Sequence, residues 1–164
     1  MLIGGRDAGK TKTLDQLFNQ EYKKIPSITI GEKKVCTCGG KKSVQEVIEF
    51  CNFNRVIEEI KSRIKKCIEK YGEDIAIILP FTVEIGGRKR STKGKINRDC
   101  IIEPLKWLKS NYKVHVVYLR GGERKTDTPS IDMLMEEVSY NLKVESREAY
   151  PEQAKEISDF IERL

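Results

Sequence analysis

Hydrophobic positions along the chain fall into two alternating patterns, and each pattern predicts one kind of element. Continuous apolar runs such as Ile75–Leu79 and Val114–Leu119 are typical of parallel strands that are buried on both faces. Segments between such runs carry apolar residues at helical spacing instead, as in Arg55–Tyr71, where Gly72 ends the pattern. The chain is therefore predicted to alternate between strands and helices.

Turn and capping residues set the limits of the other predicted elements. Two short extended runs joined by a Gly31-containing turn predict a hairpin or a bent strand, and the capping box Ser43–Glu46 predicts a helix start. Pro80 is expected to end the strand before it, and Pro151 to begin the last helix. The remaining expected strands are Met1–Ile3, Ser27–Ile30, Lys34–Cys38 and Leu142–Glu145, and the remaining expected helices are Lys10–Asn19, Asp99–Ser110 and Ser130–Asn141.

Strands separated by helices of this length imply right-handed crossovers and a parallel sheet with helices on both faces. We therefore expect residues 1–164 to form a single three-layer α/β domain with a five-stranded, mainly parallel sheet. Ligands of such sheets bind beyond the carboxyl ends of the strands. The candidate functional residues should accordingly lie just after each strand.

The segment after the first predicted strand fits the phosphate-binding pattern G-x-x-x-x-G-K-[ST] at every position. It reads Gly4, Gly5, Arg6, Asp7, Ala8, Gly9, Lys10, Thr11, and Lys12 follows it. Its glycines let successive backbone N–H groups turn inward around phosphate oxygens, and the helix that opens at Lys10 adds its unsatisfied amides. Lys10 is expected to reach the β- and γ-phosphates of ATP or another nucleoside triphosphate, and the Thr11 hydroxyl to ligate Mg²⁺. These residues predict a P-loop NTPase fold.

The order of motifs resembles that of the small P-loop kinases, in particular the nucleotide and polynucleotide kinases. Beside the P-loop, the resemblance rests on Asn97-Arg98-Asp99 followed by the strand that ends at Leu119-Arg120. It implies phosphoryl transfer from ATP to a nucleotide-like or other phosphorylated acceptor, either a small molecule or a nucleic-acid end. Such transfer depends mostly on positioning and charge neutralisation.

The resemblance also suggests roles for residues that follow the later strands. Glu84 is the candidate acid/base or metal-binding carboxylate, with Asp99 in reserve. Arg124, beside Lys125 in the loop Gly121–Thr128, is the candidate catalytic lid residue. A further set is expected to bind phosphate, namely Arg120 at the nucleotide and Arg88 and Arg98 at the acceptor.

Two alternatives to a kinase stay open. The chain could be an NTP-hydrolysing switch or assembly ATPase that acts on nucleic acid or protein, or a nucleotide-binding protein without catalysis. The basic loop Arg88–Lys95 carries five cationic side chains in eight positions and suits either a polyanionic acceptor or a solvated surface. A GTPase is less well supported, because the guanine-specific Asn-Lys-x-Asp motif is missing from Arg124–Asp127.

Composition limits the possible partners and location of the protein but does not indicate a function. The net charge of +6 makes polyanions plausible partners, yet the abundant Lys and Glu with little His also resemble hyperthermophile proteins. No apolar run is long enough to span a bilayer or to form a secretory signal, so a cytoplasmic protein without membrane contact is expected. Five cysteines fit reduced thiols, and zinc binding by Cys36, Cys38 and Cys51 is rejected, because the usual pairs of ligands are missing.

Overall fold

The computed structural model describes residues 1–5, 8–19, 26–37, 53–83, 98–121, 128–145 and 150–164. Strands and helices alternate along the described chain, except that β2 is followed by β3 and β4 by β5. In order, the elements are β1 (Leu2–Gly5), α1 (Lys10–Phe18), β2 (Ser27–Ile30), β3 (Lys33–Thr37), α2 (Phe53–Tyr71), β4 (Ala76–Ile78), β5 (Pro80–Val83), α3 (Asp99–Asn111), β6 (Val117–Arg120), α4 (Thr128–Val138), β7 (Leu142–Glu145) and α5 (Tyr150–Glu162). The helix expected from Ser43 lies outside the described residues.

The strands form two sheets. β5, β1, β6 and β7 lie in that order in a four-stranded sheet whose strands are all parallel. A smaller sheet has the order β2–β3–β4, with the predicted hairpin β2–β3 antiparallel and β4 parallel to β3. The α/β class is therefore confirmed, whereas the expected single five-stranded sheet is wrong in its strand count.

The division of the sheet arises where the chain was expected to form one strand. β4 ends at Ile78 and β5 begins at Pro80, so Pro80 starts a strand instead of ending one. Proline is tolerated at the first residue of a strand, where a missing N–H breaks no ladder. The part before Leu79 pairs with β3 and the part after it pairs with β1.

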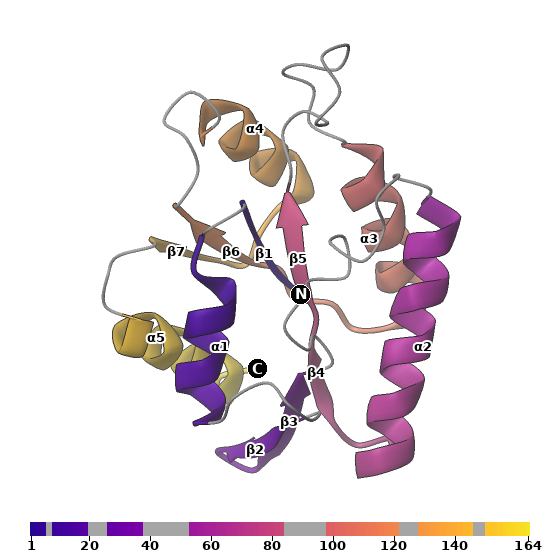
Figure 1. Cartoon of the computed structure of the whole chain (residues 1–164), viewed down its shortest axis with the longest axis vertical. Coiled ribbons are helices and arrows are strands. Elements are labelled where there is room, and N and C mark those ends of the chain that lie inside the picture. Colours follow the sequence, from indigo (N-terminus) through magenta and orange to yellow (C-terminus); the bar gives the residue numbers. More distant parts are fainter. Residues whose placement is uncertain (6–7, 20–25, 38–52, 84–97, 122–127, 146–149) are drawn as a thin grey trace.

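Helices cover both faces of the strands (Figure 1). The core of one face joins α2, α3 and α4 to strand residues such as Ile3, Phe81 and Tyr118. The core of the other face joins α1 and α5 to strand residues such as Leu2 and Leu119. Neighbouring residues of one strand thus belong to opposite cores, which explains why these strands are apolar at every position.

Two cysteines belong to the packed interior of the described chain. Cys36 of β3 and Cys67 of α2 are both buried free thiols, and a hydrogen bond with Cys67, together with burial, raises the pKa of Cys36. Cys38 and Cys51 lie outside the described residues. Within the described ranges, no helix has the length and apolarity needed to cross a membrane.

Candidate phosphate-binding site

The glycine-rich segment lies between β1 and α1, in the strand–turn–helix context that the sequence predicts. Gly4 and Gly5 are the last residues of β1, and α1 begins at Lys10. Arg6 and Asp7 lie outside the described residues. β1 is a central strand, and its chain continues into α1 on one face, whereas the neighbouring β6 continues toward α4 on the other. A crevice at the carboxyl ends of such strands is where open α/β sheets bind ligands.

Gly4 allows a close approach between β1 and β6. A Cβ atom at this position would lie 2.6 Å from the carbonyl oxygen of Leu119 and 3.1 Å from the Cβ of Ala8. Ala8 itself is fully buried, so it has little room to move away. A side chain at position 4 would therefore clash with Leu119 and crowd Ala8, so this close approach requires glycine.

Gly9 has both an unusual backbone conformation and a close neighbour. It is the N-cap of α1 with φ 80°, and its carbonyl accepts the N–H of Thr13. A Cβ atom on Gly9 would lie 2.7 Å from the Cε1 atom of Tyr150, the first residue of α5. The aromatic ring of Tyr150 thus lies directly against the loop.

Replacing Gly9 by alanine should therefore destabilise the protein more than the left-handed backbone alone explains. Gly72 is a matched control, because it has φ 90° and nothing within 4 Å of its added Cβ. We expect Gly72→Ala to lower the free energy of unfolding by about 1–2 kcal/mol, and Gly9→Ala to lower it by clearly more, as measured by urea denaturation. In a chain that already carries Tyr150→Ala, the Gly9→Ala and Gly72→Ala substitutions should lower the free energy of unfolding by similar amounts. If they lower it equally in the unmodified chain, a tight contact with Tyr150 is excluded.

Lys10 places a positive charge at the end of β1. Its Nζ donates hydrogen bonds to the carbonyl oxygens of Gly4 (3.0 Å) and Gly5 (2.7 Å), and the side chain is buried. The ammonium group is thereby fixed beside the first turn of α1, where the helix dipole also favours anions. Both contributions attract a phosphate group to the same place.

The next two residues have exposed side chains on the first turn of α1. Thr11, the predicted Mg²⁺ ligand, is exposed, and Lys12 lies with its Nζ 5.0 Å from the centroid of the Tyr150 ring. Tyr150 therefore contacts the candidate site at both Gly9 and Lys12. The sequence pattern gave no sign of this, because Tyr150 lies 140 positions away from Lys10.

A buried polar pair joins the helix of the loop to α5. The Thr13 hydroxyl donates to Oε1 of Gln153 (2.7 Å), and Nε2 of Gln153 donates to the Glu145 carbonyl (3.4 Å). Both side chains are almost fully buried. Gln153 precedes Ile157 and Ile161 at helical spacing, so it is a polar residue on the apolar face of α5. That position was the sequence feature that could have indicated a buried hydrogen bond here.

Arg120 lies at the end of β6 as predicted and has carboxylate partners in this structure. Its Nε and Nη2 donate to Asp132 at 2.9–3.1 Å, and its Nη1 donates to Glu145 at 3.3 Å. These contacts raise the pKa of Arg120. Burial would raise the pKa of Asp132, but hydrogen bonds from Arg120 and Tyr118 outweigh it and lower that pKa. The contacts use the Nε hydrogen and one hydrogen on each Nη, which is three of the five N–H donors of a guanidinium.

Arg98 has a carboxylate partner on α4 in this structure. Arg98 forms a two-contact ion pair with Glu137 that joins α3 to α4, and this pair lowers the pKa of Glu137. Glu84, Arg88 and Arg124 lie outside the described residues. Among the residues that are described, no group of three or more His, Cys, Asp or Glu side chains could hold a metal ion.

Comparison with known proteins gives no relative for this chain. No family model, curated protein or solved structure matches it.

Proposed function

We propose that the chain binds a nucleoside triphosphate with Mg²⁺ at Gly4–Thr11 and transfers the terminal phosphoryl group to a phosphorylated, nucleotide-like acceptor. The observation that carries this proposal is the position of Lys10. Its buried ammonium group is fixed by the carbonyls of Gly4 and Gly5 at the start of a helix, inside a segment that fits the phosphate-binding pattern at each position. Such an arrangement supports a P-loop NTPase fold.

In this proposal each part of the loop has its own task. Backbone amides at the start of α1 and the Lys10 ammonium hold the phosphates, while the Thr11 hydroxyl, exposed at the first turn, ligates the metal. Mg²⁺ supplies charge neutralisation at the phosphate oxygens when it is bound. Tyr150 and Lys12 form one wall beside the loop, because the ring of Tyr150 contacts both Gly9 and Lys12.

Acceptor binding is assigned to the loops beyond β5 and β6 on the basis of charge. β5 ends at Val83 and β6 at Arg120, at the same carboxyl edge of the sheet as the end of β1, and Glu84, Arg88 and Arg124 come after these ends in the sequence, outside the described residues. Arg120 joins them when a phosphate takes the place of Glu145. Of its two carboxylate partners, Glu145 is the more distant and the more exposed. Arg98 joins them by releasing Glu137.

Calorimetry and turnover test the two parts of this proposal separately. ATP with Mg²⁺ should bind with a stoichiometry near one, and ADP release should rise at least about tenfold when a suitable acceptor is added. Nucleoside monophosphates and 5′-hydroxyl oligonucleotides are the acceptors to try. Binding with acceptor-independent ADP release would favour an NTP-hydrolysing switch, and the absence of any binding would overturn the whole proposal.

A further inference from the structure

Cys36 of β3 and Cys67 of α2 form a pair of thiols inside the core that packs α2 against the strands. Both side chains are fully buried, and a hydrogen bond joins them to each other. The proposed phosphoryl transfer uses neither of them, so any role of this pair is separate from the phosphate-binding site. We name these two residues the thiol pair.

A second contact along the same two elements shows that β3 and α2 hold the thiol pair in register. The Nζ atom of Lys34 lies 5.0 Å from the centroid of the Tyr71 ring. Lys34 comes two residues before Cys36 on the strand, and Tyr71 comes four residues after Cys67 on the helix. These steps cover about 6.7 Å along a strand and about 6 Å along a helix, and each keeps its side chains on one face. The two thiols therefore meet because of how β3 packs against α2.

Both members of the thiol pair belong to regular backbone, which leaves their sulfur atoms little freedom to separate. Cys36 is paired on both sides, with Ser27 of β2 and Ile77 of β4, and Cys67 lies inside a helix of 19 residues. A disulfide joins Cβ atoms that are about 3.8 Å apart through an S–S bond of about 2.05 Å. Side chains that already share a hydrogen bond reach this geometry by rotation about χ1 and a small shift of β3 toward α2.

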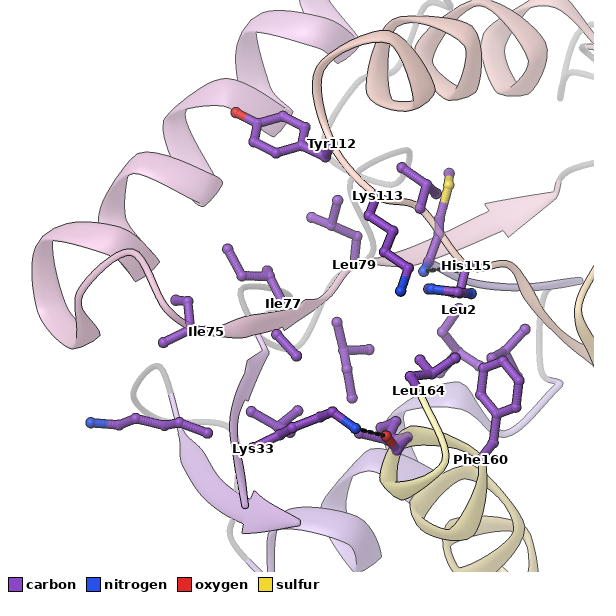
Figure 2. Close-up of a pocket in the computed structure, with 18 of the residues that line it drawn as sticks. Leu2, Lys33, Ile75, Ile77, Leu79, Tyr112, Lys113, His115, Phe160 and Leu164 are labelled. Carbon is purple, nitrogen blue, oxygen red and sulfur yellow. Dashed lines mark hydrogen bonds between the residues drawn. The ribbon is translucent and has the colours of Figure 1, made fainter. Parts of the chain in front are cut away.

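A cavity of about 1090 Å³ borders the elements that carry the thiol pair. Figure 2 shows Ile77, the neighbour of Cys36 in the small sheet, along this cavity between Ile75 and Leu79. Side chains that face a cavity lose packing contacts on that side, and segments with fewer packed contacts open locally at a lower free energy. The cavity therefore favours local opening around the thiol pair.

The surroundings of the thiol pair keep it unreactive while the core is closed. The hydrogen bond with Cys67 and burial raise the pKa of Cys36, and the positive charges of Lys70 and Lys34 oppose this rise. Because the thiolate is the form that attacks a disulfide, a closed core slows oxidation. When the core opens, the thiols regain water while both lysines remain their neighbours in the chain. Opening therefore restores reactivity.

We infer that Cys36 and Cys67 are a redox-active pair, which closes into an internal disulfide when the chain folds or opens locally in the presence of a small disulfide such as oxidised glutathione. One protein thiolate attacks the oxidant and releases one glutathione, which leaves a mixed disulfide. The other protein thiolate attacks the protein sulfur of that mixed disulfide and releases the second glutathione. The two protons and two electrons of the thiols end on the two glutathione molecules, and the new bond links β3 to α2.

Refolding the reduced chain from urea with oxidised glutathione tests this inference. Mass spectrometry of non-reduced peptides should find the Cys36–Cys67 bond as the main product. The melting temperature should lie about 5 °C or more above that of the same chain in dithiothreitol, because the bond closes a loop of about 30 residues. Dithiothreitol should reverse both changes. A chain with Cys38→Ala, Cys51→Ala and Cys100→Ala retains the thiol pair alone and should behave in the same way.

Three results would overturn the inference. The first is the absence of a cross-link, or a main product in which Cys36 is joined to another cysteine. The second is a bond that leaves the melting temperature unchanged or lowers it, because the folded core would then not accommodate the disulfide. The third is an equal gain from the oxidant in Cys36→Ala and Cys67→Ala, since each of these chains lacks one partner. Slower oxidation of the folded chain than of the refolding chain, by about tenfold or more, would support protection by burial.

Discussion

Lys10→Ala is expected to weaken the binding of ATP and Mg²⁺ by about 10²-fold or more while leaving the chain folded. The substitution removes a buried ammonium group that the carbonyls of Gly4 and Gly5 hold beside the helix start. Losing one partner of a buried charged pair costs about 2–5 kcal/mol, and each 1.4 kcal/mol is a tenfold change in affinity. Isothermal titration calorimetry measures this change directly.

Two companion variants make this result interpretable. Lys10→Met retains an apolar stem of similar length, so it separates loss of charge from loss of packing in the buried position. Lys65→Ala removes an exposed cation on α2 and should change nothing. If Lys10→Met binds ATP as the unmodified chain does, the central proposal of a phosphate-binding loop is wrong.

Arg124→Ala is expected to lower kcat by about 10²-fold or more with little change in KM for ATP. Arg124 follows Arg120 in the sequence, and Arg120 ends β6 at the carboxyl edge of the sheet, where β1 ends with Gly4 and Gly5. An arginine that closes over the transferring phosphate stabilises charge that develops mainly in the transition state. The effect should therefore appear in turnover and not in binding.

Steady-state kinetics with a productive acceptor provide the measurement, with Lys65→Ala again as the distant control. A parallel rise in KM and fall in kcat would make Arg124 an ordinary binding residue. If neither parameter moves, and no acceptor accelerates ADP release, the kinase proposal has to be abandoned in favour of nucleotide binding alone.

Local elements were predictable because local patterns determine them. The hairpin β2–β3 and the strand Leu142–Glu145 occur where turn residues and apolar alternation place them. The start of α1 at Lys10 also agrees, since the motif itself contains the helix start. In each case the forces that decide the structure act within a few residues.

The arrangement of the strands was not predictable in the same way. An apolar run at Ile75–Leu79 looks alike whether it pairs with β1 or β3, and the chain divides its pairing between the two at Leu79. Likewise Val114–Leu119 has strand character throughout, but only the part beside β1 forms a ladder. Strand pairing depends on which segments meet in the folded chain, and a single sequence contains little direct information about such long-range contacts.

In the candidate site, the residues of the motif were predictable from the sequence, whereas the residues that contact the motif were not. Gly9 and Lys10 were expected from the spacing of one short segment, while Tyr150 and Gln153 reach the loop from the other end of the chain. The two carboxylates on Arg120 belong to α4 and β7, which the sequence alone does not bring together. Contacts of this kind follow from the tertiary fold.

Helix α5 gives the molecule two chemically different ends. It begins with Tyr150 beside Gly9 and ends where Lys33 donates to the carbonyls of Ile161 and Glu162, a span of about 20 Å for its 13 residues. Figure 1 shows both chain termini away from the start of α1. A fluorophore or surface tether attached after Leu164 would therefore leave the candidate phosphate-binding site open, and it would report on events at the far end of α5.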